Sequence, residues 1–371
     1  MDDFDNNISD DAGRSQNSIP HISMTPENFH RKSTMLYGES KTGKSVIIYN
    51  IFKILQKIIP IFVIISPTSA SNGDYDDRVP GMLIYKEATK ELLEKLYMRQ
   101  EAAALFYRKA NKIEILEKLY KRVQDPKTSA IINNMTARRY KALRMAEQQL
   151  KGKSGAEDKM KEIAEAFEDT LRNMYRITIR RHKRYLETQT MTNDEKYSLK
   201  YLDFNPDMAL VMDDCAAQIK TWGKDPTIGK IFFQGRHNYI TSIYTFQHDR
   251  LLDTLYRQNA FVSIFTTKKV VLAYFGRDTN NFERDEQDIV RAIAHKLFKN
   301  PKAYRKFVYI REAKIQFQYI KAEIYPKFRV CFPSVWKYCE RVKSDEEILD
   351  EDNPFIKNFM LGQKQDYSAT F

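Results

Sequence analysis

The chain has 371 residues, of which 42% are hydrophobic and 30% are charged, and it carries a formal net charge of +12. This composition is typical of a globular protein and excludes collagen-like, mucin-like and disulfide-scaffold classes. The three cysteines are too few and too widely spaced for a zinc site. Because no apolar run is long enough to cross a bilayer and no apolar leader follows Met1, we expect a protein that is neither secreted nor integral to a membrane.

The charge is unevenly distributed along the chain. Residues 1–30 carry a net charge of −5 and show no apolar periodicity, which predicts an acidic disordered arm. The remaining residues therefore carry +17. Such a basic body favours a polyanionic partner, because clustered Lys and Arg gain affinity by releasing counterions from phosphates.

The first regular pattern is a strand, a glycine loop, a helix and a second strand. Residues 33–37 read as a short strand, residues 45–57 have the apolar spacing of a helix, and residues 61–66 form a continuous apolar run that ends at a proline. A run that is apolar at every position is typical of a strand buried on both faces. The pattern predicts a β-α-β unit.

A long helical insertion follows. Residues 86–190 are rich in helix-forming residues and carry a net charge of +10. Many of these charges are expected on solvated helix faces, where they pair three or four residues apart. Two denser basic clusters are candidates for phosphate contacts or for a partner surface: Arg138, Arg139, Lys141 and Arg144, and then Arg176, Arg180, Arg181, Lys183 and Arg184.

Beyond the insertion, strands alternate with helices again. Apolar strand runs at 209–212, 240–246 and 261–267 are separated or followed by helical stretches at 226–237, 250–258 and 283–299, and residues 306–311 and 315–325 predict a hairpin at the sheet edge. The expected fold class is α/β, with a mostly parallel sheet flanked by helices. The expected domains are the arm at 1–30, a core of 31–85 and 200–330, the basic helical insertion at 86–199, and a C-terminal tail region at 331–371.

The glycine loop carries the clearest chemical signal. Its sequence fits G-x-x-x-x-G-K-[ST] at every fixed position, between a strand and a helix, which is the pattern of a phosphate-binding P-loop. Backbone N–H groups of such a loop form an anion nest at a helix N-terminus, so ATP is the expected ligand. Lys44 would lie between the β- and γ-phosphates, and Ser45 would ligate Mg²⁺. The predicted nucleotide-binding residues are Gly38, Glu39, Ser40, Lys41, Thr42, Gly43, Lys44 and Ser45.

Two further strand ends carry polar groups at the edge where ligands bind in open α/β sheets. The run at 208–212 ends in Asp213, which would hold Mg²⁺, and Asp214, which would orient or deprotonate the attacking water. The run at 240–246 ends in Gln247, which could contact the γ-phosphate or the water. These residues predict nucleotide hydrolysis.

Arg236 lies just before the strand that ends in Gln247, and therefore at its far end. From there it is better placed to reach the nucleotide of a neighbouring subunit than its own, as an arginine finger acting in trans would be. Arg250, Arg257 and Arg277 are lesser candidates for this role.

These motifs, GESKTGKS, ALVMDDC, Gly235-Arg236-His237 and SIYTFQ in that order, resemble the genome-packaging ATPases of large nucleo-cytoplasmic DNA viruses, a branch of the FtsK/HerA class of P-loop motors. The resemblance implies a P-loop NTPase of the additional-strand type, in which one strand intervenes between the P-loop strand and the Asp-Asp strand. It also implies a homo-oligomeric ring that translocates double-stranded DNA, capsid, portal or virion membrane proteins as partners, and a place in the host-cell cytoplasm at the virus factory or in the virion.

Two other functions remain open on the sequence alone. A P-loop also serves phosphotransferases such as nucleoside kinases, and the basic insertion could imitate their closing lid. A nucleotide-switched scaffold that hydrolyses slowly or not at all is the non-enzyme alternative.

Overall fold

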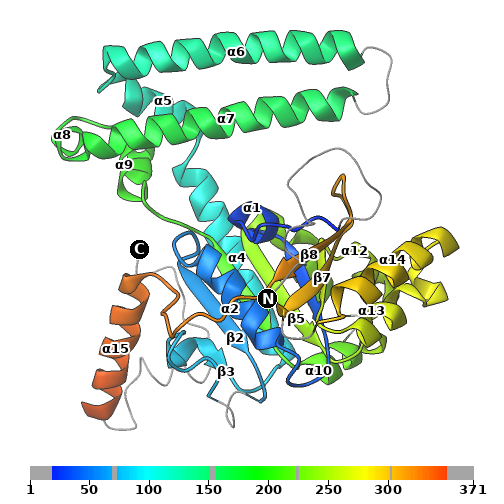
Figure 1. The fold of residues 1–371 in the computed structure, drawn as a ribbon. Helices are drawn as coiled ribbons and strands as arrows, with labels where there is room; N and C mark the ends of the chain where they lie inside the picture. Colours follow the sequence, from blue (N-terminus) through cyan, green and yellow to red (C-terminus); the bar gives the residue numbers. More distant parts are fainter. Residues whose placement is uncertain (1–18, 69–72, 151–155, 223–224, 301–302, 349–371) are drawn as a thin grey trace. The chain divides into compact units, whose positions relative to one another are not determined.

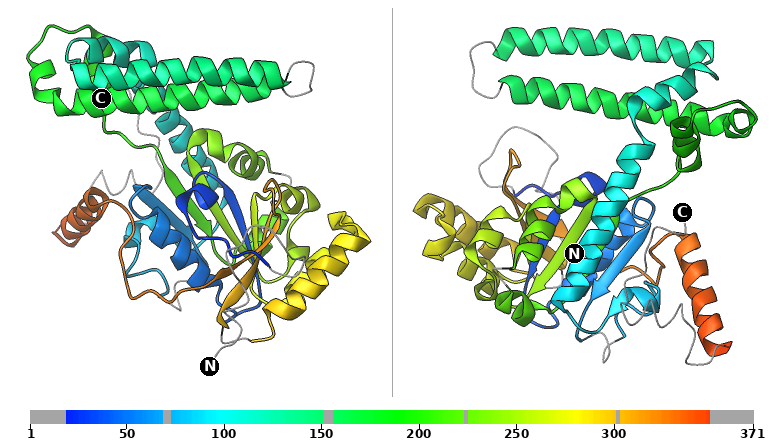
Figure 2. Two further views of the ribbon diagram at one scale, coloured as in Figure 1. Left: turned by 45° about the horizontal axis from the view of Figure 1, so that its top comes forward. Right: turned by 180° about the vertical axis from the view of Figure 1, so that it is seen from behind.

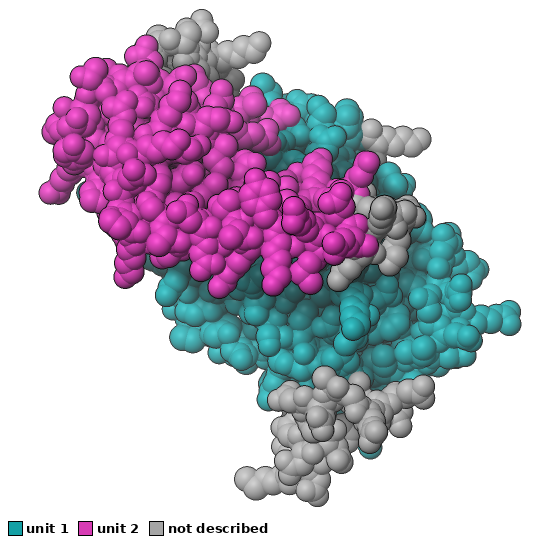
Figure 3. Space-filling view, turned by 90° about the horizontal axis from the view of Figure 1, so that it is seen from above, with its two compact units in different colours: residues 1–100, 207–371 teal, residues 101–206 magenta. Residues whose placement is uncertain are grey.

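The computed structural model describes residues 19–68, 73–150, 156–222, 225–300 and 303–348. It divides into two compact units, residues 1–100 with 207–371 and residues 101–206, which Figure 3 colours separately. The domain boundaries expected near 86 and 199 stay predictions. The expected tail beyond residue 348 lies outside the described residues.

The first unit is built on one eight-stranded sheet with the order β3-β2-β4-β5-β1-β6-β7-β8 (Figure 1). The six strands from β3 to β6 are parallel to one another. β7 runs antiparallel to β6, and β8 runs antiparallel to β7. The strands are β1 Ser33–Tyr37, β2 Ile61–Ile65, β3 Ile84–Tyr85, β4 Met208–Met212, β5 Ile240–Phe246, β6 Val262–Phe265, β7 Arg305–Ile310 and β8 Phe317–Lys321.

The strand order confirms the additional-strand arrangement. β5 pairs with the P-loop strand β1 on one side and with the Asp-Asp strand β4 on the other. The predicted β-α-β unit is present as β1, α2 (Lys44–Leu55) and β2, but β4 and β5 lie between its two strands. The expected mostly parallel sheet with a C-terminal hairpin is likewise confirmed.

Helices cover both faces of this sheet, as Figures 1 and 2 show for α2 and α4 (Lys90–Ala110). On one face α2 buries Ile47 and Ile51 in the same core cluster as Leu36 of β1. On the other face α4, α13 (Lys268–Phe275) and α14 (Arg284–Leu297) all contribute residues to a second core cluster, which includes Tyr37 and Phe265. Alternate residues of β1 thus lie in different cores, as the period of a strand requires.

The remaining helices of this unit are short apart from the last one. They are α1 Pro26–Phe29, α10 Ala216–Thr221, α11 Pro226–Gly229, α12 Thr254–Asn259 and α15 Pro333–Ile348. None of the helices in the described part of the chain is both long and apolar enough to cross a membrane.

The second unit is helical. After the end of α4 it consists of α5 Ile113–Lys121, α6 Pro126–Leu150, α7 Ala156–Arg181, α8 Lys183–Glu187 and α9 Asn193–Lys200. Its core contains residues such as Leu116, Ile179 and Leu199. Arg122 donates to both carboxylate oxygens of Glu195, at 2.8 and 3.0 Å, and Glu195 also completes a capping box with Thr192 at the start of α9. The helical insertion therefore has a core and polar anchors of its own.

The prediction of a disordered arm was wrong for residues 19–30. Ile22 and Phe29 are buried, and the backbone of Pro20 and Ile22 bonds to Tyr319 of β8. These apolar residues are too sparse to give a period, so their burial follows from tertiary contacts and not from a local pattern. The rest of the arm lies outside the described residues.

Candidate functional site

The predicted P-loop joins β1 to α2 at the carboxyl end of the parallel strands. The loop begins where Gly38 N–H donates to Phe246 O at 3.0 Å, which extends the pairing of β1 with β5. Gly43 has φ of 92° and caps α2, a left-handed conformation that glycine adopts at little cost. The final glycine of the motif is thus required by the backbone.

Position 38 requires glycine because neighbouring side chains leave no space for a Cβ atom there. A Cβ added to Gly38 would lie 1.8 Å from Thr266 Oγ1 and 2.7 Å from Thr42 Oγ1. The two hydroxyl oxygens are themselves 2.7 Å apart, and Thr266 Oγ1 also lies 3.2 Å from Tyr37 O. The loop is therefore held against the end of β6 by a threonine pair that leaves no room for a side chain at position 38.

Lys44 folds back over the loop. Its Nζ donates to Gly38 O at 2.7 Å and to Glu39 O at 3.0 Å. Partial burial lowers the pKa of Lys44, and the negative charges of Asp213 and Asp214 oppose that shift. The pairing of β5 with both β1 and β4 places the P-loop and the Asp-Asp strand end at the same edge of the sheet, where their charges can interact.

Asp213 is buried and its carboxylate is oriented by two hydroxyl groups. Thr245 Oγ1 donates to Oδ1 at 2.6 Å, and Tyr75 OH donates to Oδ2 at 2.8 Å. Burial raises the pKa of Tyr75 well above its usual value, and the charge of Asp213 adds to that shift, so the phenol stays a donor. A carboxylate with one bond to each oxygen retains lone pairs for a cation.

Asp214 contacts the end of the neighbouring strand. It has φ of 59°, its N–H donates to Thr245 Oγ1 at 3.0 Å, and its Oδ1 accepts from Gln247 Nε2 at 3.2 Å. The predicted pair of Asp214 and Gln247 is thus in direct contact, and both are half-buried. Thr245 bonds to both aspartates at once.

Thr245 and Tyr75 belong to the site although no motif in the sequence marks them as site residues. Thr245 offered a weak signal, since it is a polar residue inside the otherwise apolar end of a strand that stops at Gln247. Tyr75 offered none, because it lies in the loop after β2 and reaches Asp213 across 138 residues of sequence. Cys215 follows Asp214 directly, but burial raises the pKa of its thiol to about 12, which argues against a nucleophilic role.

Arg236 lies at the opposite edge of the sheet, before β5 begins. Its side chain is exposed, and its Nε lies 3.3 Å from His237 Nε2. It lines a cavity of about 690 Å³ together with Lys32, His237 and Arg311. β5 spans about 20 Å at roughly 3.3 Å per residue, so Arg236 is remote from Gln247 on its own chain.

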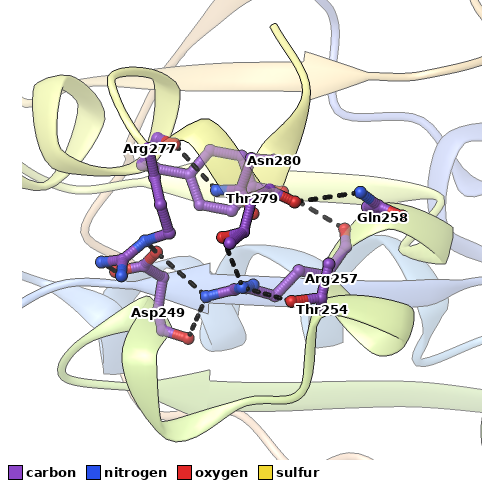
Figure 4. Close-up of polar contacts among 8 residues, drawn as sticks. Asp249, Thr254, Arg257, Gln258, Arg277, Thr279 and Asn280 are labelled. Atoms are coloured by element: carbon purple, nitrogen blue, oxygen red, sulfur yellow. Dashed lines mark hydrogen bonds and ion pairs between the residues drawn. The ribbon is translucent and has the colours of Figure 1, made fainter.

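Arg257 and Arg277 both bind one carboxylate (Figure 4). Asp249 is buried two residues after Gln247, and Arg277 donates to its two oxygens at 2.7 and 2.9 Å. Arg257, also buried, approaches the same carboxylate at 3.4 Å and donates to Thr254 and Thr279. Both arginines are held within their own subunit, whereas Arg250 is exposed.

The P-loop on β1, the aspartates on β4, the glutamine on β5 and the strand order together define a P-loop NTPase fold of the additional-strand type. No family model matches the sequence.

The chain belongs to the family of protein B354L of African swine fever virus, an uncharacterized protein to which it is 30% identical over 358 residues, covering 92% of this chain and 97% of the relative. The fold is also similar to the genome packaging NTPase B204 of Sulfolobus turreted icosahedral virus 2 in complex with ATP-gammaS, with a TM-score of 0.36, 12% identity, and coverage of 80% of this chain and 98% of that one. The plasmid coupling protein TrwB gives a TM-score of 0.35 at 13% identity, over 86% of this chain and 92% of that one.

Asp249→Asn should lower the free energy of unfolding by about 3 kcal/mol, because it leaves the buried Arg257 guanidinium without its anion. Urea denaturation followed by circular dichroism measures the change. Asp278→Asn is the matched control: Asp278 is an exposed aspartate in the same region, and its replacement should change stability by no more than about 0.5 kcal/mol. A loss below about 1 kcal/mol for Asp249→Asn would show that the carboxylate does not hold the two arginines.

Proposed function

We propose that this protein is an ATP-hydrolysing motor that translocates double-stranded DNA and packages a viral genome into the capsid. ATP hydrolysis is supported by one observation: Lys44, Asp213, Asp214 and Gln247 all lie at the same edge of the sheet. The basic surface described below and the order of the four motifs support DNA as the polymer. The viral source of the B354L relative supports genome packaging and a place in the host-cell cytoplasm, at the virus factory, or in the virion.

The residues at this edge fit a magnesium nucleotide. Mg²⁺ prefers oxygen ligands and usually keeps several waters and substrate phosphates, so it needs only one or two protein groups. Ser45 and Asp213 would supply a hydroxyl and an oriented carboxylate. In the described residues no cluster of three or more His, Cys, Asp or Glu side chains forms a site for another kind of metal. When bound, Mg²⁺ would neutralise charge that develops on the phosphates.

The chain's own groups would then act on the phosphates and the water. Loop N–H groups from Gly38 to Ser45 would bind the phosphates, and Lys44 would exchange its two carbonyl partners for phosphate oxygens. Asp214 would accept a hydrogen bond or proton from the attacking water. Gln247, already bonded to Asp214, would fix the direction of that carboxylate and contact the γ-phosphate.

Asp214→Asn should bind ATP nearly as well as the parent chain but hydrolyse it at less than about a tenth of the parent rate, because the size of the side chain is kept and the proton acceptor is lost.

Lys44→Ala should lose hydrolysis to the same extent and should also bind ATP more weakly, because a positive charge at the phosphates is removed. Phosphate release and equilibrium ATP titration measure the two properties. Loss of ATP binding by Asp214→Asn would make Asp214 a metal ligand instead of the base.

The proposed ring rests on the position of Arg236. A side chain at the amino edge of β5 can reach a second nucleotide only across a head-to-tail interface between subunits, which closes into a ring when the rotation allows. The cavity beside Arg236 adds the positive charges of Lys32 and Arg311 at that edge. The negatively charged phosphates of a neighbouring subunit's ATP would be attracted to these positive charges.

Arg236→Ala should reduce turnover about 10³-fold with ATP binding preserved, as the loss of an arginine finger does. Mixing Arg236→Ala subunits with Lys44→Ala subunits should restore some hydrolysis, because a mixed interface pairs an intact P-loop with an intact arginine. Arg284→Ala, which changes an exposed arginine outside this cavity, is the matched control and should keep most activity. A mixture that assembles but stays inactive would show that Arg236 does not act in trans.

The two basic clusters of the insertion differ in how many of their residues already bind groups of the same unit. Arg176 donates to Tyr107 and to Leu202 O, and Arg180 pairs with Asp203 at 2.6 Å, so part of the second cluster is used inside the unit. On α6, by contrast, Glu147 is the only acidic residue. Arg138, Lys141 and Arg144 are exposed and form no ion pair among the described residues. The exposed ring of Tyr140 lies among them.

The α6 cluster of Arg138, Lys141 and Arg144 is therefore the proposed contact with the DNA backbone. Replacing these three residues with Gln should weaken binding of duplex DNA uniformly across sequences. The salt slope should fall by up to about 0.9 for each phosphate that the variant no longer neutralises. Fluorescence anisotropy at several salt concentrations measures both effects.

The matched control removes the same charge from exposed positions on and after α14, with Arg284, Arg291 and Lys299 changed to Gln. If both triple variants lose affinity equally, net charge and not the α6 surface determines binding. A capsid, portal or virion membrane protein would then be the proposed partner of α6.

ATPase rates with and without long duplex DNA separate the proposed function from its alternatives. A motor is stimulated by DNA, a phosphotransferase is stimulated by a small acceptor, and a nucleotide-switched scaffold responds to neither.

A further inference from the structure

Lys306 is a buried lysine that lies outside the predicted nucleotide-binding and catalytic residues. It is the second residue of β7, which runs antiparallel to β6. Because β7 is antiparallel, its first residues lie at the edge where the parallel strands end, beside Thr266. The Lys306 residue as a whole is only 9% exposed. The C-terminal hairpin thus delivers a cation to the edge of the P-loop.

The ammonium group contacts the loop itself. Lys306 Nζ donates to Thr42 O at 2.9 Å and lies 3.5 Å from Thr266 O. Among the described residues no carboxylate forms an ion pair with it, and burial lowers the pKa of its ammonium group. A buried cation without an anion is costly, so a nearby negative ligand would relieve this arrangement.

The contact with Lys306 fixes the orientation of the peptide group between Thr42 and Gly43. In a planar trans peptide the C=O and N–H groups point in opposite directions. The Thr42 carbonyl points toward Lys306, so the Gly43 N–H points away from it. That N–H belongs to the run of loop N–H groups that cradles phosphates in the P-loop pattern.

We propose that Lys306 is a positioning residue for nucleotide binding: it holds the Thr42–Gly43 peptide with its N–H toward the phosphates and adds a positive charge behind the loop. The proposal rests on the proposed function of the P-loop. Lys306 acts through the loop backbone, in contrast to Lys44, which would touch the phosphates.

The same C-terminal region also holds the helix that follows the loop. Asn50 of α2 donates through Nδ2 to Glu323 O at 2.7 Å and accepts through Oδ1 from Glu323 N at 3.1 Å. Glu323 lies just after β8. The loop and its helix are therefore tied to the hairpin region at two points, and Lys306 supplies the charged one.

Titration of the full chain with ADP by isothermal calorimetry tests the proposal without depending on hydrolysis. Lys306→Met keeps the length of the side chain but removes its charge and donors, so ADP should bind about tenfold more weakly, the order expected for a charged hydrogen bond. Lys306→Arg keeps both and should stay within about threefold of the parent. Lys321→Met, which removes an exposed lysine from the same hairpin, is the matched control and should bind ADP like the parent.

A purely structural role would lower the unfolding free energy of Lys306→Met but leave the affinity of the folded protein for ADP unchanged, and that result would overturn the proposal. If Lys306→Met does not fold, Lys306→Gln, which keeps a neutral donor, takes its place, and an affinity equal to the parent's would overturn the proposal in the same way. Failure of the parent chain itself to bind ADP would overturn the proposed function of the P-loop, and the role of Lys306 with it.

Discussion

The pairing of β5 between β1 and β4 sets the position of almost every polar group in the candidate site. The register places Tyr37 opposite Phe246 on one side and Met212 opposite Tyr244 on the other. The P-loop, the aspartates and Gln247 therefore leave the sheet at nearly the same level. Thr245, one residue before the end of β5, is thereby level with Asp213, and its single hydroxyl donates to that carboxylate while accepting from the Asp214 N–H. A shift of one residue in β5 would turn Thr245 to the other face and break both bonds.

Several polar groups do not touch the nucleotide themselves but orient the P-loop and Asp213, which would touch it. Tyr75 and Thr245 orient Asp213, the threonine pair 42 and 266 fixes the start of the loop, and Lys306 binds its centre. These contacts come from a loop, from β5, from the end of β6 and from β7, so they require the whole sheet to be assembled. The conformation of the P-loop is thus determined by tertiary contacts as well as by its glycines.

Much of the fold could be predicted from the sequence, because strong local patterns carry it. Short, largely apolar runs located β1, β2, β4 and β5 to within a residue, and the G-x-x-x-x-G-K-[ST] pattern located the loop. The short strand β3 and the helices α1, α10, α13 and α15 went unpredicted, since they are too short or too weakly periodic to stand out in the sequence.

The supporting residues of the site could not be predicted in the same way. Tyr75 and Lys306 reach the site from 138 and 264 residues away in sequence, and nothing in their own neighbourhood marks them. The pairing of Arg180 with Asp203 and of Arg277 with Asp249 similarly decides which basic residues are available, and that cannot be read from a charge count. Sequence patterns find the residues that belong to a motif, whereas residues that orient them are found only from the fold.

The crowding at Gly38 has an evolutionary consequence. Any side chain at position 38 would collide with the hydroxyls of both Thr42 and Thr266, and it would lie 3.0 Å from Thr266 Cβ. Replacing one threonine alone relieves only part of the overlap. A lineage that keeps this backbone can fill position 38 only after both threonines have been replaced by smaller residues, because an intermediate that gains the side chain earlier carries a distorted loop. The first glycine of the loop and two threonines 224 positions apart therefore form one inherited unit.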